Sequence, residues 1–82
     1  MRIKKKWGDR IYIEWVDAYS EDGWKFYKDM MEITDTVFCY TNGWYVGESK
    51  DFLVICCTKG KNIKREMMGK LVIPKKWIRK VR

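Results

Sequence analysis

The chain has no histidine, one proline and three cysteines among its 82 residues. The lack of histidine excludes the usual serine and cysteine triads and the commonest transition-metal sites. No cysteine spacing typical of zinc and no glycine-rich phosphate loop is present. The acidic residues Asp17, Glu21 and Asp22 cluster without a nucleophile partner, and carboxylates in such a segment usually cap turns. We therefore expect a protein that is not an enzyme and that uses no cofactor and no metal.

The sequence also lacks an apolar run of the ~18 residues that a membrane helix needs. Its basic start is not followed by the apolar core of a signal peptide. Cys39, Cys56 and Cys57 cannot all pair with one another, and the adjacent two have poor geometry for a bridge, so free thiols are expected. Free thiols suit a reducing compartment, and we predict a cytoplasmic protein that does not associate with a membrane.

Hydrophobic residues are abundant, at 46% of the chain, and five tryptophans, five tyrosines and three phenylalanines are among them. This composition is typical of a folded protein, although a chain this short buries only a modest core. We expect a basic N-terminal arm over residues 1–9 and a single domain over residues 10–82.

The net charge of +7 is unevenly distributed. Residues 1–10 carry a charge of +4, residues 11–35 carry −5, and residues 36–82 carry +8. A basic exterior with a separate acidic segment suits a phosphate-bearing partner on one face and another contact elsewhere. The alternative is that these charges are only solvated and aid solubility.

Alternating apolar residues predict a first strand over residues 10–18, with Ile11, Ile13 and Trp15 on one face. Apolar residues at helical spacing then predict a helix of two to three turns from Trp24 to about Ile33. Its expected N-cap is Asp22 or Ser20. Further strands are expected over residues 36–46, 52–58, 67–73 and 78–81, with one helical turn over residues 74–77.

The position of the first hairpin turn has two interpretations. Asn42-Gly43 between β-rich segments is a strong hairpin signal, but residues 47–51 form an equally plausible turn. We prefer the second, since a turn at Asn42 would leave a strand of only about four residues before the next turn. Gly43 would then be a bend that gives one long strand the curvature of a small barrel.

The order of these elements resembles that of SH3-like barrels, in which a strand, a proline, one helical turn and a short strand end the chain. More specifically, the sequence resembles a group of small uncharacterised proteins encoded by bacteriophages and prophages. The resemblance rests on three segments: Asp17, Ala18, Ser20, Asp22, Gly23 and Trp24; Thr41, Gly43 and Trp44; and Ile73, Pro74 and Lys75. It implies a five-stranded SH3-like or Sm-like barrel with a helix inserted after the first strand. It also implies a phage accessory protein that binds and neutralises a host component.

Exposed aromatic side chains beside basic ones are the candidate binding residues, because aromatic rings stack on bases or peptides and cations attract anions. On this basis we predict that the ligand contacts Trp24, Trp44, Tyr45, Lys75, Trp77 and Arg79. Asp17, Ser20 and Asp22 form a predicted acidic loop contact. If the two ends of the chain lie together, the basic residues 4–6 and 75–82 would join into one patch.

The leading functional hypothesis is counter-defence by a self-associating binding protein that sequesters a host protein or an anionic nucleotide signal in the host cytoplasm. The first alternative is an SH3-like or Sm-like module that binds RNA or DNA, favoured by the net charge. A third possibility is a structural interaction protein that makes its contact through the acidic segment 14–35.

Overall fold

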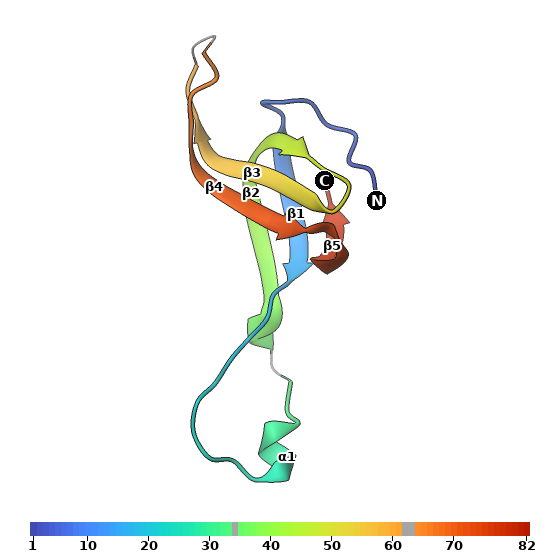
Figure 1. Ribbon diagram of the computed structural model, residues 1–82, viewed down its shortest axis with the longest axis vertical. Helices are drawn as coiled ribbons and strands as arrows, with labels where there is room; N and C mark the ends of the chain where they lie inside the picture. The colour runs from blue at the N-terminus through green and yellow to red at the C-terminus, as the bar shows by residue number, and fades with distance from the viewer. Residues whose placement is uncertain (34, 62–63) are drawn as a thin grey trace.

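A computed structural model gives the structure of residues 1–33, 35–61 and 64–82. Its five strands are β1 (Arg10–Val16), β2 (Phe38–Glu48), β3 (Phe52–Lys59), β4 (Met67–Pro74) and β5 (Ile78–Val81). They form one antiparallel sheet in the order β4-β3-β2-β1-β5 (Figure 1). The prediction of a mainly β fold with five strands is therefore confirmed.

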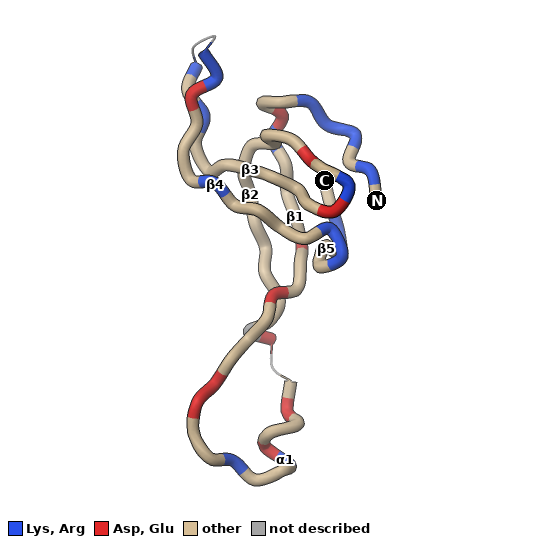
Figure 2. Tube along the Cα trace, viewed as in Figure 1, with Lys and Arg blue, Asp and Glu red and all other residues tan. Residues whose placement is uncertain are grey.

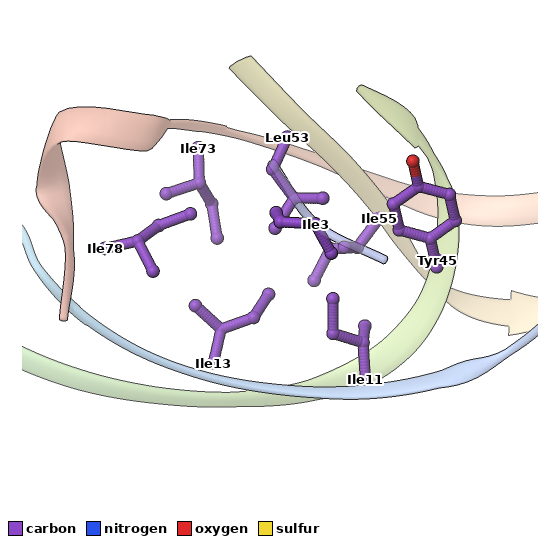
Figure 3. Close-up of a cluster of buried hydrophobic side chains, with 8 residues drawn as sticks. All are labelled: Ile3, Ile11, Ile13, Tyr45, Leu53, Ile55, Ile73 and Ile78. Atoms are coloured by element: carbon purple, nitrogen blue, oxygen red, sulfur yellow. The ribbon is translucent and has the colours of Figure 1, made fainter. Parts of the chain in front are cut away.

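The sheet curves, so that β3 and β4 cross over β1 and β2 (Figure 1). Between these two parts lies a small core made mostly of branched aliphatic side chains, shown in Figure 3: Ile3, Ile11, Ile13, Tyr45, Leu53, Ile55, Ile73 and Ile78. Within the described part of the chain no pairing joins the outer strands β4 and β5, so the closed barrel expected from the sequence is not seen.

The strand β2 runs straight through Asn42-Gly43, and the chain turns at residues 49–51. The preferred interpretation of this segment is thus confirmed. At Gly43 the backbone of β2 lies so close to β3 that a Cβ there would be 2.7 Å from the carbonyl oxygen of Cys56. Only glycine fits there without a shift of backbone.

The segment between β1 and β2 differs from its prediction. It holds a four-residue helix, α1 (Tyr27–Met30), and a 3₁₀ turn, η1 (Asp35–Val37), instead of a helix of two to three turns. The N-cap of α1 is Phe26, without a side-chain cap, and neither Asp22 nor Ser20 has that role. We call residues 17–33 and 35–37 the excursion, because they extend away from the sheet (Figure 1). The apolar spacing there does not produce a long helix, since α1 has no buried face to stabilise it.

The N-terminal arm, residues 1–9, lies against the sheet and contributes Ile3 to the core. The amide of Gly8 donates to the carbonyl of Tyr45 at 2.9 Å, and the amide of Tyr45 donates to the carbonyl of Asp9 at 2.8 Å. At the other end of the chain, the 3₁₀ turn η2 (Lys75–Trp77) connects β4 to β5, as the sequence predicts. In the part of the chain that is described, no helix is long and apolar enough to cross a membrane.

Candidate anion-binding surface

The two ends of the chain come together and form a basic cleft, which we call the terminal cleft. It has a volume of about 400 Å³ and lies between the N-terminal arm and β5. Six of its nine lining residues are basic and none is acidic: Arg2, Lys4, Lys5, Arg79, Lys80 and Arg82 supply the charge. Figure 2 shows basic segments of the arm close to the C-terminal end. The ends of the chain therefore lie together, which is the condition under which the sequence predicts a joint basic patch, although Lys6, Lys75 and Lys76 do not line the cleft.

Backbone pairing fixes the C-terminal side of the terminal cleft. The amide of Tyr12 donates to the carbonyl of Arg82 at 2.8 Å, and the amide of Arg82 donates to that of Tyr12 at 2.9 Å. The Arg82 guanidinium lies 4.8 Å from the centre of the Tyr12 ring, within cation–π range. Arg82 is thus held beside β1, while Arg79 and Lys80 on β5 remain exposed.

A second basic feature lies where the arm enters β1, and we call it the aromatic–basic stack. Lys59 Nζ lies 5.3 Å from the ring centre of Trp7 and 5.0 Å from that of Trp44. The Arg65 guanidinium lies 5.1 Å from the Trp7 ring, and the Arg10 guanidinium lies 4.9 Å from the Trp44 ring. Three cations therefore alternate with two indole rings.

The arm joins the two features, because residues 1–5 line the terminal cleft and Trp7 belongs to the stack. Gly8 makes the turn between Trp7 and β1 with φ of +89°, a left-handed conformation that favours glycine. The result is a continuous basic band from β5 along the arm to the end of β3. A surface of this kind attracts anions, and the excess of one sign makes the attraction long-ranged at low salt.

Two of the predicted ligand residues, Tyr45 and Lys75, are buried in a polar network beneath the arm. Lys75 Nζ pairs with Glu48 Oε2 at 2.5 Å and donates to the Met1 carbonyl at 3.2 Å. The Tyr45 hydroxyl donates to Glu48 Oε1 at 2.9 Å, and the amide of Ile3 donates to Glu48 Oε2 at 3.3 Å.

This network satisfies the charges of Glu48 and Lys75 internally. The hydrogen bond from Lys75 holds the pKa of Glu48 below its usual value, while burial and then the bond to Glu48 raise the pKa of Tyr45. Lys75 is only 9% exposed and Tyr45 only 7%. The structure therefore places both of these predicted ligand residues in an internal network, where their polar groups are bonded to other parts of the chain.

The other predicted residues near the sheet have separate places. Trp44 belongs to the aromatic–basic stack and Arg79 to the terminal cleft. Trp77 stacks on Trp15 with ring centres 6.4 Å apart and an interplanar angle of 9°. Trp15 packs against the core, and its Nε1 donates to Thr41 Oγ1 at 2.9 Å. Trp77 is therefore a partly exposed packing residue at the closing end of the sheet.

Trp24 and the predicted acidic contact residues lie on the excursion, away from the basic band (Figure 2). Trp24 is fully exposed, so it does not fasten a helix to the sheet. Asp17 accepts a hydrogen bond from the amide of Ala18 at 2.8 Å, which is a local turn contact. Ser20 and Asp22 are exposed. The structure does not bring these residues together with Trp44 or Arg79.

Sequence reasoning missed Trp7, Lys59 and Arg65 as members of one cluster. Trp7 follows a run of lysines and precedes a glycine, which is a weak signal for an ordered arm. The distances along the chain are long, and only the pairing of β1, β2 and β3 brings the three segments together. Among the residues that the structure describes, no group of three possible metal ligands is found, and the three cysteines are free.

Comparison with known proteins gave no relatives. No family model matches the chain, no curated protein matches it, and no solved structure matches it.

Proposed function

We propose that this protein is a non-catalytic binding module that captures a phosphate-bearing anion in the terminal cleft. The observation that carries the proposal is the composition of that cleft, whose lining has six basic side chains and no acidic one. Phosphate oxygens accept charge-assisted hydrogen bonds from guanidinium and ammonium groups, and arginine does so with two donors at once.

A nucleotide is the ligand class that best fits the size and charge of the terminal cleft. The volume of the cleft, about 400 Å³, lies within the usual range of small-ligand pockets. Lys4 and Lys5 reach it from the arm, and Arg79 and Arg82 from the opposite side, so phosphates between them would meet cations on two sides. The resemblance to phage proteins suggests the biological role that we propose, which is neutralisation of a host component. The protein would sequester an anionic nucleotide signal or a host protein in the cytoplasm.

We further propose that the curved sheet is a variant of the SH3-like or Sm-like barrel. The support is the strand order, with η2 between β4 and β5, and the shared core of Ile73 on β4 and Ile78 on β5. In this interpretation the excursion is the long loop that follows the first strand.

A nucleic-acid-binding module is the second candidate, and the aromatic–basic stack favours it. Single strands bind to surfaces that combine a basic track with aromatic rings. The basic band extends from Arg79 through the arm to Trp7 and Trp44, which is longer than a mononucleotide needs. The rings of Trp7 and Trp44 already carry cations, so backbone phosphates are the expected contact along this part of the band.

The experiment that separates the two is calorimetric titration with ATP, a cyclic dinucleotide and a single-stranded oligonucleotide. Nucleotide capture predicts binding of one small ligand per terminal cleft. The double variant Arg79→Gln/Lys80→Gln should weaken it by about tenfold or more, which corresponds to about 1.4 kcal/mol. A matched control is Lys28→Gln/Lys50→Gln, which removes two exposed charges outside the cleft and should bind as the unaltered protein does.

Salt dependence gives the second readout. Oligonucleotide binding should fall steeply between about 50 and 200 mM salt, with a slope set by the number of phosphates contacted. If only the oligonucleotide binds, the second candidate replaces the first. If neither class of anion binds, or if the Arg79→Gln/Lys80→Gln protein binds as tightly as its control, the proposed function is wrong.

A further inference from the structure

The excursion exposes more apolar surface than a small soluble domain usually leaves open. Seven of its large hydrophobic side chains are exposed: Tyr19, Trp24, Phe26, Tyr27, Met30, Met31 and Ile33. None belongs to the core cluster, and α1 has no buried residue. Contiguous exposed apolar surface on this scale typically marks an interaction site.

The charge of the excursion is opposite to that of the rest of the molecule. Residues 17–35 carry six acidic and two basic side chains, whereas the other residues carry sixteen basic and five acidic ones. In the described part of the excursion the only ion pair is Lys25 with Glu21, at 2.8 Å. Asp22, Asp29 and Glu32 are exposed and make no ion pair in the described part of the chain. Its apolar side chains are thus accompanied by acidic groups that outnumber the two lysines of the excursion.

A complementary surface lies on β3 and β4 of the same chain. A groove of about 400 Å³ has one charged residue in its lining, which consists of Val46, Val54, Ile55, Cys56, Met67, Met68, Gly69 and Lys70. Ile55 and Cys56 in this lining are buried, whereas Met67, Met68 and Lys70 on β4 are exposed. Methionine side chains adapt their shape to an incoming aromatic group.

The surroundings of this groove are basic. Lys70 lies at its lining, and the chain from β3 to β4 contains Lys61, Lys64 and Arg65 and one acidic residue, Glu66, so its net charge is positive. The strand β4 is also an edge strand, paired on one side with β3 alone. The groove thus complements the excursion in two ways: both surfaces are apolar, and their charges are opposite in sign.

The two surfaces cannot meet within one chain. The molecule is 55 Å long, and the excursion extends away from the sheet that contains β3 and β4 (Figures 1 and 2). We propose that the excursion of one copy docks into the β3–β4 groove of a second copy, with Trp24 and its neighbours in the groove and Asp22 and Asp29 facing Lys61 and Lys70.

Each contact joins two different surfaces, the excursion of one copy and the groove of another, so two arrangements are possible. A reciprocal exchange gives a dimer with two identical contacts, and a head-to-tail arrangement gives a ring or a filament. In both forms the groove of another copy covers the excursion. Both forms use a surface that is separate from the terminal cleft.

The experiment is a charge-swap complementation read by light scattering and native mass spectrometry. The donor variant is Asp22→Lys/Asp29→Lys, and the groove variant is Lys61→Glu/Lys70→Glu. Each alone should be monomeric, because like charges then face each other at every contact. An equimolar mixture should restore assembly, since the lysines of one variant face the glutamates of the other in one contact and the original charges face each other in the second.

Two further variants complete the design. Trp24→Ser should weaken self-association by about tenfold or more without altering charge. Lys50→Glu/Lys76→Glu matches the groove variant in charge but lies outside the groove, and it should assemble as the unaltered protein does. Circular dichroism of each variant confirms that the sheet is folded.

An unaltered protein that is monomeric at micromolar concentration and low salt would overturn the proposal and leave the excursion for a different protein partner. The proposal also fails if the donor variant assembles normally, or if the mixture stays monomeric although both variants are folded. Anion binding by the donor variant, whose terminal cleft is intact, is measured in parallel, so failure of self-association is distinct from failure of the proposed function.

Discussion

The carboxylate of Glu48 and the ammonium of Lys75 form an ion pair beneath the N-terminal arm, although 27 residues separate them in the chain. Glu48 ends β2, and Lys75 begins η2 directly after β4. The same carboxylate accepts hydrogen bonds from Tyr45 and from the amide of Ile3. One acidic group therefore joins the arm, β2 and the turn before β5.

Loss of one partner of this pair should destabilise the protein strongly. Lys75→Met leaves the Glu48 charge without its cation in a poorly solvated place, and we expect a loss of about 3 kcal/mol in the free energy of unfolding. The double variant Glu48→Leu/Lys75→Met removes both charges and should be more stable than Lys75→Met alone. Urea denaturation measures both, and equal stability of the single and double variants would contradict an energetically coupled pair.

The same pair predicts how stability changes in acid. The pKa of Glu48 is lowered in the folded state, mainly by Lys75. The stabilisation that ionised Glu48 gives to the folded protein is therefore fully present above the usual pKa of 4.5, and it is lost as the pH falls through the lowered pKa of the folded state. Glu48→Gln should therefore be less stable than the unaltered protein at neutral pH, and the difference should shrink below about pH 4.5. Thermal unfolding between neutral and acidic pH measures this, and a difference that grows in acid would contradict it.

The sheet could be predicted from the sequence because its signals are local. Alternation of Ile11 and Ile13 with polar residues identifies β1, and Pro74 followed by a helical turn identifies the connection to β5. The turn after Glu48 was also predictable, since a hairpin at Asn42-Gly43 would leave too short a strand. The helical spacing from Trp24 to Ile33 gave a wrong prediction of a helix of two to three turns. Periodicity shows which side chains would share a face of a helix, but it does not show whether another part of the protein covers that face.

The site was less predictable because it depends on contacts between distant segments. Arg79 lines the terminal cleft, in a basic patch that the sequence predicts for the case in which the chain ends meet. The sequence does not show whether a lysine is buried, so it predicted that Lys75 contacts a ligand. In the structure Lys75 forms an ion pair with Glu48. Lys59 and Trp7 come together only through the arm and β3, which no local pattern indicates.

Gly43 should tolerate no side chain, whereas Gly47 on the same strand should. A Cβ at Gly43 would lie 2.7 Å from the Cys56 carbonyl oxygen, which is backbone and cannot rotate away, while a Cβ at Gly47 meets nothing within 4 Å. We expect Gly43→Ala to lose about 2 kcal/mol of stability and Gly47→Ala to change it by less than about 1 kcal/mol. Urea denaturation of the two variants is the measurement, and equal losses would contradict the close approach at Gly43.

Lys59 should stabilise the fold through both tryptophan rings of the aromatic–basic stack. Lys59→Met removes two cation–π contacts, and we expect a loss of about 1 kcal/mol at this half-buried position. A double-mutant cycle with Trp7→Leu isolates one contact, and Lys50→Met, an exposed lysine outside the stack and the groove, is the control and should be neutral. Additive losses in the cycle would show that the Lys59 ammonium and the Trp7 ring are not coupled.

Trp15 and Trp24 should differ sharply in their effect on the stability of the fold, although both are tryptophans. Trp15 packs against the core, stacks on Trp77 and donates to Thr41, so Trp15→Ala should cost about 3 kcal/mol. Trp24 is fully exposed, and Trp24→Ala should change the stability of the monomer by less than about 0.5 kcal/mol. The measurement is urea denaturation at several protein concentrations. If Trp24→Ala is less stable than the unaltered protein only at high concentration, the Trp24 side chain is buried between copies. A large loss at every concentration would place Trp24 in the core of the single chain and contradict the excursion as an exposed surface.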